Sequence, residues 1–273
     1  MISRPLVRYI LTAAMRDKLL LTLLLMIATG AGLAVFLGSS AITEKDGFAL
    51  VFGASGLRFL GVMGIVLFCC FYVRRSFETK EVEFLLSRPI SRMTFVFSHA
   101  LAFMLLSALI ACGIAAAVFF LGKPSLSGLA AWGLSIAVEG MIMANVAFFF
   151  SMVLSSAAGS ALAALGFYVL SRLIGTLIGI ASAAPENVIY AILNNVMDFI
   201  SIIVPRLDIM GQSGWLVYGV DGSGGIGYLA QAGHYTQVMM THLGILGFIG
   251  VQGVAFVALV LAATAFDFLR REF

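Results

Sequence analysis

The chain has 273 residues, of which 62% are apolar and only 11% are charged, and its mean hydropathy is +1.09. A soluble globular domain is about half apolar and about a quarter charged, so this composition excludes an ordinary soluble domain. The net charge of +3 says little about partners, because the positions of the charges are more informative than their sum. We expect the chain to lie in a lipid bilayer and to have no nucleic-acid partner.

Six stretches are long and apolar enough to cross a membrane, which takes about 20 residues at a rise of about 1.5 Å each. The fourth and fifth are separated only by a predicted turn near Ser155, Ser156 and Gly159. The sequence therefore predicts an all-α polytopic membrane protein, with one transmembrane domain over residues 1–273. The six predicted spans cover about residues 18–37, 54–73, 94–121, 128–153, 158–181 and 243–266.

Basic residues gather before the first predicted span, between the second and third, and after the last. They are Arg4, Arg8, Arg16 and Lys18, then Arg74, Arg75, Lys80, Arg88 and Arg92, and finally Arg270 and Arg271. Loops rich in Lys and Arg remain on the cytoplasmic side of a membrane. We therefore expect the chain in the cell membrane (inner or plasma membrane), with its N- and C-termini in the cytoplasm.

Residues 1–17 have the pattern of an amphipathic helix. Leu6 and Ile10 share an apolar face, and the arginines occupy the opposite arc. Ser3 can cap this helix, and Pro5 suits its first turn. We expect an interfacial helix lying on the inner leaflet, with a frayed cytoplasmic tail as the alternative.

The predicted exterior loop, residues 182–241, is long. Between Val188 and Ile203 its apolar residues recur with helical period, and polar residues such as Asn194 and Asp198 take the other side. We expect an amphipathic or re-entrant helix at the outer face before the last span. A seventh span is less favoured, because it would place Asn194 and Asp198 in hydrocarbon and move the C-terminus outside.

The segment 74–93 is the only substantial polar stretch among the predicted cytoplasmic segments. We expect a short helix from about Phe77 to Leu86. Pro89 would end this helix, and Ser91 can cap the third span.

Residues 81–92 read Glu-Val-Glu-Phe-Leu-Leu-Ser-Arg-Pro-Ile-Ser-Arg. This run resembles a signature of the type 2 ATP-binding-cassette (ABC) exporter permeases, which carry an acidic helix and then Leu-Leu-Ser-x-Pro-[Ile/Val]-Ser-Arg between their second and third spans. The rest of the chain is similar to that family in outline, with an N-terminal interfacial helix, six spans and an outer helical excursion. Two positions depart from the pattern and bear on the subfamily: Thr79-Lys80 replaces a common Gly-Thr, and His99 replaces a common Lys.

The resemblance implies that residues 74–93 form a coupling segment that enters a groove on a separate ATPase subunit. Such a contact needs apolar anchors and surrounding charges that fix their register, and a proline would stiffen the junction with the third span. The residues implied in ATPase coupling are Glu78, Glu81, Glu83, Phe84, Leu85, Leu86, Arg88, Pro89 and Arg92. The alternative is an ordinary solvated loop whose arginines only set the topology.

The resemblance also implies an exporter assembled from two copies of an ABC ATPase subunit and two permease subunits, which are identical or related chains. ATP and Mg would then bind to the partner ATPase. The present sequence contains no G-x-x-x-x-G-K-[ST] phosphate-binding loop. We therefore expect that this chain is not itself an enzyme and that it has no catalytic residue, metal ligand or cofactor of its own.

Glu139 and Arg172 are the charged residues inside the fourth and fifth predicted spans, roughly 15 and 13 Å below the outer surface by the helical rise. An unpaired charge at mid-membrane costs about 3 kcal/mol or more, so we expect the two to meet. A structural ion pair is preferred over a substrate contact, and Asn145 could extend the network. Arg58, about one turn below the outer surface, is expected to extend its side chain to the headgroups.

Two other functions remain open at this point. A permease driven by an ion gradient could use the region of Glu139 and Arg172. The Gly-x-Ser-Gly strings at Ser55 and Ser213, with His242 at the start of the last span, resemble the rhomboid intramembrane serine proteases. In that family, however, the serine opens the fourth span, whereas Ser213 is expected in a polar exterior loop.

Overall fold

The computed structural model describes residues 2–40, 45–87, 90–181, 192, 196, 200, 204–218 and 234–270. These ranges contain helices and connecting turns and no strand. The helices are α1 (Arg4–Arg16), α2 (Lys18–Ser39), α3 (Lys45–Glu78), α4 (Glu81–Leu86), α5 (Arg92–Gly122), α6 (Leu126–Val153), α7 (Ala157–Ala181), α9 (Leu207–Gln212), α10 (Trp215–Tyr218) and α12 (His234–Arg270).

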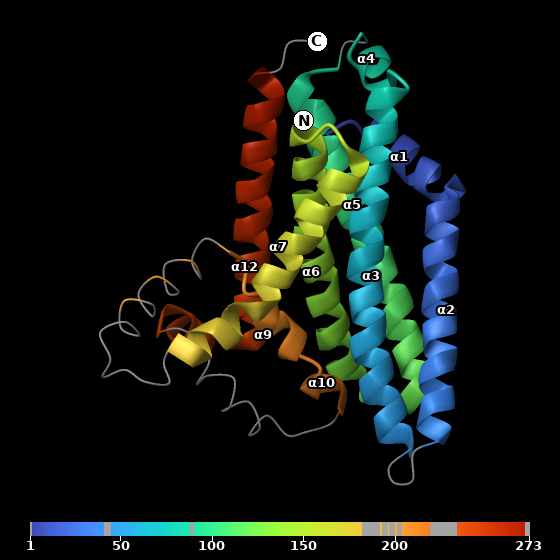
Figure 1. The fold of residues 1–273 in the computed structure, drawn as a ribbon, viewed down its shortest axis with the longest axis vertical. Coiled ribbons are helices and arrows are strands. Elements are labelled where there is room, and N and C mark those ends of the chain that lie inside the picture. The colour runs from blue at the N-terminus through green and yellow to red at the C-terminus, as the bar shows by residue number, and fades with distance from the viewer. Residues whose placement is uncertain are drawn as a thin grey trace.

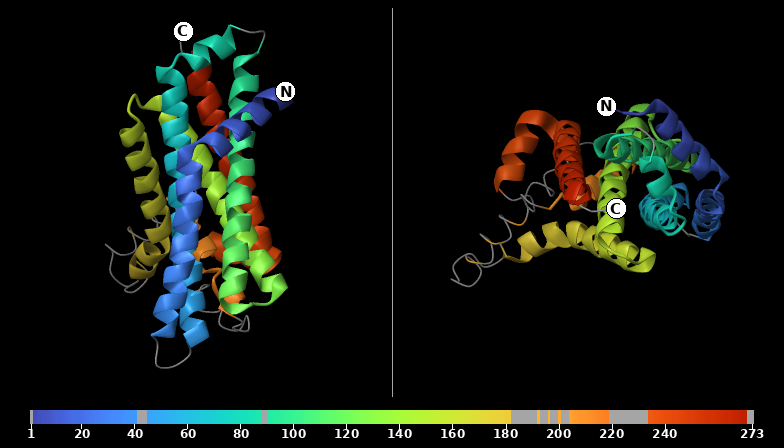
Figure 2. Two further views of the ribbon diagram at one scale, coloured as in Figure 1. Left: turned by 90° about the vertical axis from the view of Figure 1, so that its right-hand side faces the viewer. Right: turned by 90° about the horizontal axis from the view of Figure 1, so that it is seen from above.

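The six long helices α2, α3, α5, α6, α7 and α12 are long and apolar enough to cross a membrane, which confirms the prediction of an all-α protein with six such segments. They form an elongated bundle (Figure 1). Both ends of the chain lie at the end of the bundle that carries α1 and α4, here named the α4 end (Figures 1 and 2). The short helices α9 and α10 lie toward the opposite end, here named the α9 end.

Helix α6 is the centre of the bundle. Its most apolar window is 72% buried, against 22% for α2 and 28% for α12. It packs against α3, α5, α7 and α12. A polar side chain on α6 therefore has protein around it on several sides, while α2 and α12 present most of their surface outward.

The ends of α5 and α6 follow from local chemistry. The Ser91 hydroxyl accepts a hydrogen bond from the Thr94 N–H at 3.2 Å, which confirms the predicted cap. At its other end α5 is terminated by Lys123 in a left-handed conformation, with φ of 44°. The Ser125 hydroxyl then caps α6 by accepting from the Gly128 N–H at 3.3 Å.

Helix α1 is amphipathic, as predicted, and crosses the bundle obliquely at the α4 end (Figure 2). It buries Leu6 and Ile10 and packs mainly against α5. The predicted capping by the Ser3 side chain is wrong. The Ser3 side chain caps no N–H, and the Ser3 backbone N–H instead donates to the Ser98 hydroxyl of α5 at 3.0 Å.

Helix α12 contains a break at Gly244, where φ is 68° and ψ is 172°. Residues with a side chain rarely adopt this backbone conformation, so glycine is required here. The residues before Gly244 turn aside from the long part of α12 (Figure 1). Most of the predicted helical stretch between Val188 and Ile203 lies outside the described residues.

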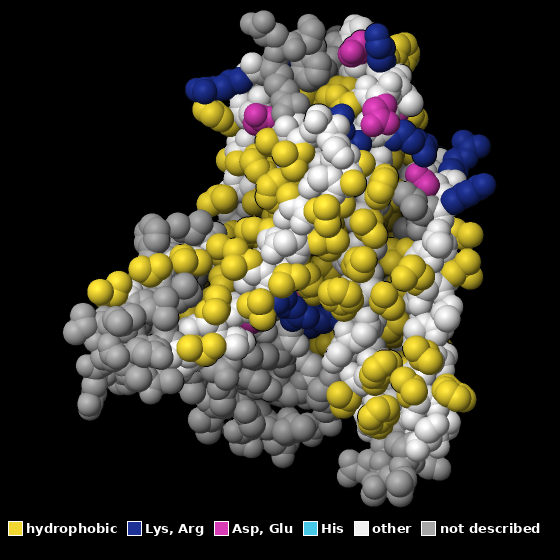
Figure 3. Space-filling model, viewed as in Figure 1, with side chains coloured by type: hydrophobic (Ala, Val, Ile, Leu, Met, Phe, Trp, Pro, Cys, Tyr) yellow, Lys and Arg dark blue, Asp and Glu magenta, His cyan; other side chains and the backbone are white. Residues whose placement is uncertain are grey.

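The charges divide the surface into zones. Lys and Arg side chains gather at the α4 end, above a broad apolar surface (Figure 3). A separate basic group lies lower down, with apolar side chains above it (Figure 3). This second group is unusual because an apolar surface of this kind faces hydrocarbon in a membrane.

Prediction for Gly128. A Cβ atom at Gly128 of α6 would overlap the backbone carbonyl oxygen of Leu216 in α10. Because a backbone cannot rotate out of the way as a side chain does, we expect Gly128→Ala to destabilise the fold by about 1–3 kcal/mol. That loss would lower the thermal unfolding midpoint in detergent by about 2–4 °C for each kcal/mol.

The matched control is Gly113→Ala in α5, where no atom lies within 4 Å of the added Cβ. This variant is expected to unfold at the wild-type temperature or slightly above it, because alanine favours a helix more than glycine does. Equal midpoints for the Gly128 and Gly113 variants would show that α10 does not pack on α6 as described.

Candidate functional site

A sharp turn of the chain separates α3 from α4. Lys80 adopts a left-handed conformation with φ of 58°, and its N–H donates to the Phe77 carbonyl at 3.1 Å. The predicted start of the short helix near Phe77 is therefore wrong. Helix α3 continues to Glu78, and α4 begins only at Glu81.

One side of α4 is fixed to the bundle. Val82 is 1% exposed, and the Glu81 carboxylate accepts a hydrogen bond from Ser76 of α3 at 3.3 Å. Glu81 also accepts a hydrogen bond from the Tyr9 phenol of α1, and this bond and partial burial raise the pKa of Tyr9 above its ordinary value of 10.0. Helix α4 is thus held by α1 and α3 together.

The other side of α4 faces outward. The Phe84 side chain is 59% exposed at the α4 end of the bundle, and Glu83 beside it is also exposed. Glu78, at the end of α3, is exposed as well. An aromatic side chain beside two carboxylates, on a helix held from behind, is a surface suited to a protein partner.

The remaining residues of the predicted coupling segment have different positions. Leu85 is partly buried and packs against the core of the bundle, so it faces inward like Val82. Arg92 donates to the Leu269 carbonyl at 3.2 Å, near the end of α12, where the last carbonyls of a helix are free to accept. The Leu86 side chain and all of Arg88 and Pro89 lie outside the described residues.

A second polar site lies inside the bundle, where Arg58 of α3 meets Glu139 of α6. The Arg58 Nε and Nη2 atoms both lie 2.5 Å from Glu139 Oε2, and the side chains are 3% and 0% exposed. The expectation that Arg58 reaches the headgroups is wrong. Helix α3 begins at Lys45, and Arg58 is therefore about 20 Å along it by the helical rise, far too deep to reach that end.

Two buried serines complete the surroundings of Arg58. Its Nη1 donates to the Ser135 hydroxyl of α6 at 3.2 Å and to the Ser213 hydroxyl at 3.0 Å. The two hydroxyl oxygens are 2.8 Å apart. Ser213 lies between α9 and α10 and is fully buried, so the expectation that it lies in a polar loop is wrong.

The segment carrying Ser213 enters the bundle from the α9 end. Helix α9 packs against α7 and α6, and α10 packs against α6 and α3. Leu207 and Met210 of α9 are fully buried. Apolar side chains therefore carry this segment into the bundle, and the Ser213 hydroxyl joins it to Arg58.

Arg172 of α7 approaches Glu139 from the other side. Its Nε is 3.7 Å from Glu139 Oε1, and its Nη1 donates to the Leu207 carbonyl at 3.2 Å. The guanidinium also stacks on Tyr168, with 5.5 Å between Cζ and the ring centre. A Cβ at Gly211 would overlap Nη1, so glycine is needed for α9 to lie against this side chain.

A further ion pair lies within the buried segment. Arg206 donates to both oxygens of Asp208, with Nε to Oδ1 at 3.0 Å and Nη2 to Oδ2 at 2.9 Å. A Cβ at Gly175 of α7 would overlap Asp208, which shows how closely α9 and α7 approach. Asn145 is not brought into this group, since its amide donates to the Met141 carbonyl at 2.7 Å.

The surroundings of Ser213 do not resemble those of a catalytic serine. A nucleophilic serine needs a base within hydrogen-bonding distance. The Ser213 hydroxyl instead contacts Arg58, Ser135 and the Met210 carbonyl, and His242 is exposed. Within the described residues no group of His, Cys, Asp and Glu could hold a metal ion.

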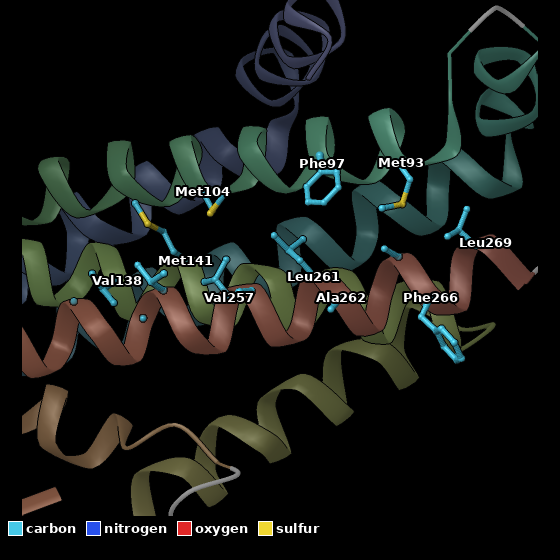
Figure 4. A pocket seen from close by; sticks show the side chains of 15 residues that line it. Met93, Phe97, Met104, Val138, Met141, Val257, Leu261, Ala262, Phe266 and Leu269 are labelled. Atoms are coloured by element: carbon cyan, nitrogen blue, oxygen red, sulfur yellow. The ribbon is translucent and has the colours of Figure 1, made fainter. Parts of the chain in front are cut away.

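An apolar groove of about 830 Å³ lies on another side of the bundle, between α5, α6 and α12 (Figure 4). Met93 and Phe97 of α5 and Leu261 of α12 point into it. Its lining contains apolar residues and glycines and no charged group. The groove can therefore accept an apolar chain or helix, but it has no means of selecting a polar ligand.

Prediction for the ion pairs of Glu139. Removing one member of a buried ion pair typically costs about 3–5 kcal/mol, and we expect a loss of this size for Glu139→Gln. Adding Arg58→Gln should recover part of that loss, because the two charges are in direct contact. Adding Arg172→Gln should recover less. Double-mutant cycles on unfolding in detergent measure both coupling energies, and a larger coupling to Arg172 than to Arg58 would contradict the structure.

Comparison with known proteins assigns no function to the chain. The outward face of α4 and the buried polar site around Glu139 are therefore the basis for any functional conclusion. No protein-family model matches the chain, and no curated protein matches it significantly in sequence.

Proposed function

We propose that this chain is the membrane-spanning permease subunit of an ABC transporter, an exporter in which a separate ATPase subunit drives substrate translocation. In this proposal α4 is the coupling helix, and α1 lies in the interface of the inner leaflet. The chain works with a second permease subunit, identical or related, and with two ATPase subunits that bind ATP and Mg. It lies in the cell membrane with both termini in the cytoplasm.

The observation that carries the proposal is the geometry of α4. Its backbone is held to α1 and α3 through Glu81 and the burial of Val82, while Phe84 and Glu83 are exposed. A force applied to Phe84 would therefore act on α3, and on α5 through the short connection that ends at Ser91. A coupling element needs this combination of an outward apolar anchor and a rigid attachment.

The distribution of charge supports the proposed orientation. Lys and Arg side chains gather at the end that carries α4 and both termini (Figure 3). Under the positive-inside rule this end belongs in the cytoplasm, where ATP is available. The α9 end, with its segment between Val204 and Tyr218, then faces the exterior.

Prediction for Phe84. The tagged chain is purified in mild detergent from membranes of its own host, and the ATP hydrolysis that co-purifies with it is measured, together with labelling of the partner by an azido-ATP probe. We expect Phe84→Asp to lower both by about tenfold or more, because a carboxylate would replace an aromatic anchor in an apolar contact.

The matched control is Leu126→Asp, which makes the same change at a 72% exposed residue of the α9 end. This variant should retain the ATPase at the wild-type level. Equal recovery of the ATPase with both variants would overturn the role of α4, and absence of any ATPase from the wild-type preparation would overturn the proposed function.

A permease driven by an ion gradient is the second candidate, and the buried Glu139 favours it. Its Oε1 atom accepts no hydrogen bond from the described residues. The purified chain in liposomes with a trapped pH-sensitive dye separates the two candidates. Under the ABC proposal the chain alone leaves an imposed proton gradient intact, whereas a flux abolished by Glu139→Gln would favour the second candidate.

A further inference from the structure

A pocket of about 550 Å³ lies at the corner where α1 meets α2. Its volume is within the range of small-molecule sites, roughly 300–1,000 Å³. It is lined by one face of α1, by Lys18 at the start of α2 and by Arg75 in the last turn of α3. None of its lining residues belongs to α4 or to the polar site around Glu139.

The part of the pocket that α1 supplies is polar. Tyr9, Thr12 and Arg16 follow one another at intervals of three and four residues, which places them on one face of the helix. All three are exposed, whereas Leu6 and Ile10 of the same helix are buried in the bundle. The side of α1 that lines the pocket is therefore open to a ligand.

The pocket is basic. Its lining contains three cations, Arg16, Lys18 and Arg75, and one carboxylate, Asp17. The Asp17 Oδ2 atom lies 3.4 Å from Arg75 Nη1. Among the side chains that the structure describes, Arg16 and Lys18 form no ion pair. Guanidinium and ammonium groups that converge on one pocket are suited to the oxygens of a phosphate.

The pocket lies at the height where lipid headgroups are found. The apolar segment of α2 that is long enough to cross a membrane begins at Leu21, less than one turn after Lys18. Basic side chains gather at the corner between α1 and α2 (Figure 3). Basic pockets at the ends of spanning helices are a recognised kind of site for anionic headgroups.

An apolar surface continues from the pocket along α2. Leu21 and Leu25 are 61% and 58% exposed, and they follow Lys18 by three and seven residues, which places all three on one face of the helix. A molecule with its anionic group at Lys18 would therefore find apolar surface beside its other end. A soluble phosphate would use the pocket alone, so this continuity favours an amphiphile.

We propose that the pocket binds the phosphate of an anionic phospholipid. Arg16, Lys18 and Arg75 surround the phosphate, and an acyl chain lies along Leu21 and Leu25. Asp17 holds the Arg75 guanidinium at the edge of the pocket, so that α1, α2 and α3 meet around the headgroup. The site does not depend on the proposed ATPase partner.

The test uses the isolated full chain in nanodiscs of phosphatidylcholine, with or without phosphatidylglycerol. Thermal unfolding and the number of phosphatidylglycerol molecules retained in native mass spectrometry are measured. The pocket variant is Arg16→Gln with Lys18→Gln. The matched control is Arg4→Gln with Arg8→Gln, which removes the same charge from exposed residues of α1 that do not line the pocket.

Phosphatidylglycerol is expected to raise the unfolding temperature of the wild type and of the control. The pocket variant should lose this response and one retained phosphatidylglycerol, with affinity weaker by about tenfold or more. In phosphatidylcholine alone it should unfold as the wild type does, because both substituted side chains are exposed.

Thr12→Glu tests the same pocket while Arg16 and Lys18 stay in place. Thr12 is exposed and its hydroxyl donates only to the Arg8 carbonyl of its own helix, so the fold should tolerate the change. The added carboxylate should repel a phosphate and lower phosphatidylglycerol retention.

Three results would overturn the proposal. Equal losses in the pocket variant and the control would show that the basic end attracts anionic lipid without a specific site. Full retention by both the pocket variant and Thr12→Glu would show that the pocket binds no lipid. If glycerol phosphate, added to phosphatidylcholine discs, stabilises the wild type as much as phosphatidylglycerol does, the ligand is a soluble phosphate instead.

Discussion

The ion pair between Arg58 and Glu139 is the interaction on which the rest of the bundle depends. It joins α3 to α6, the helix with the most buried apolar window, at a depth where neither charge can reach water. The Arg58 Nη1 atom also donates to Ser135 and Ser213, and Ser213 belongs to a different part of the chain. Arg58 thus joins α3 to Glu139 of α6 and to Ser213 of the α9–α10 segment.

The sequence predicted what depends on length and on local chemistry. Six apolar stretches, the amphipathic α1 and the cap at Ser91 all follow from signals within a few residues. The role of Arg58 was missed because the second span was taken to begin at residue 54, whereas α3 begins at Lys45. The nine apolar or small residues from Gly47 to Ser55 were the available signal that the helix starts earlier and that Arg58 is deep.

The pairing inside the bundle could not be predicted for a different reason. Glu139 and Arg172 were expected to meet, and they do approach, but the closer partner of Glu139 comes from α3. Which helices are neighbours depends on packing across the bundle, and no periodicity in a single helix reports it. Ser213 illustrates the same limit, because a serine in a short glycine-containing segment gives no sign of being carried into the core by Leu207 and Met210.

The two ends of the molecule differ in charge and in the short helices that they carry. The α4 end combines basic side chains with a helix that presents Phe84 outward, while the α9 end has a short segment packed between spanning helices. Helix α3 connects them, because it is tied to α4 at one end and carries Arg58 toward the other. Under the proposed function, a movement imposed on α4 would be transmitted by α3 to the buried charges.

Crosslinking from residue 84 tests the central claim most directly. A photoreactive phenylalanine analogue in place of Phe84, in the full chain in its own cells, should give a crosslinked product whose partner contains an ATP-binding subunit identified by mass spectrometry. Products formed only with lipid, or with proteins on the exterior side of the membrane, would contradict the account.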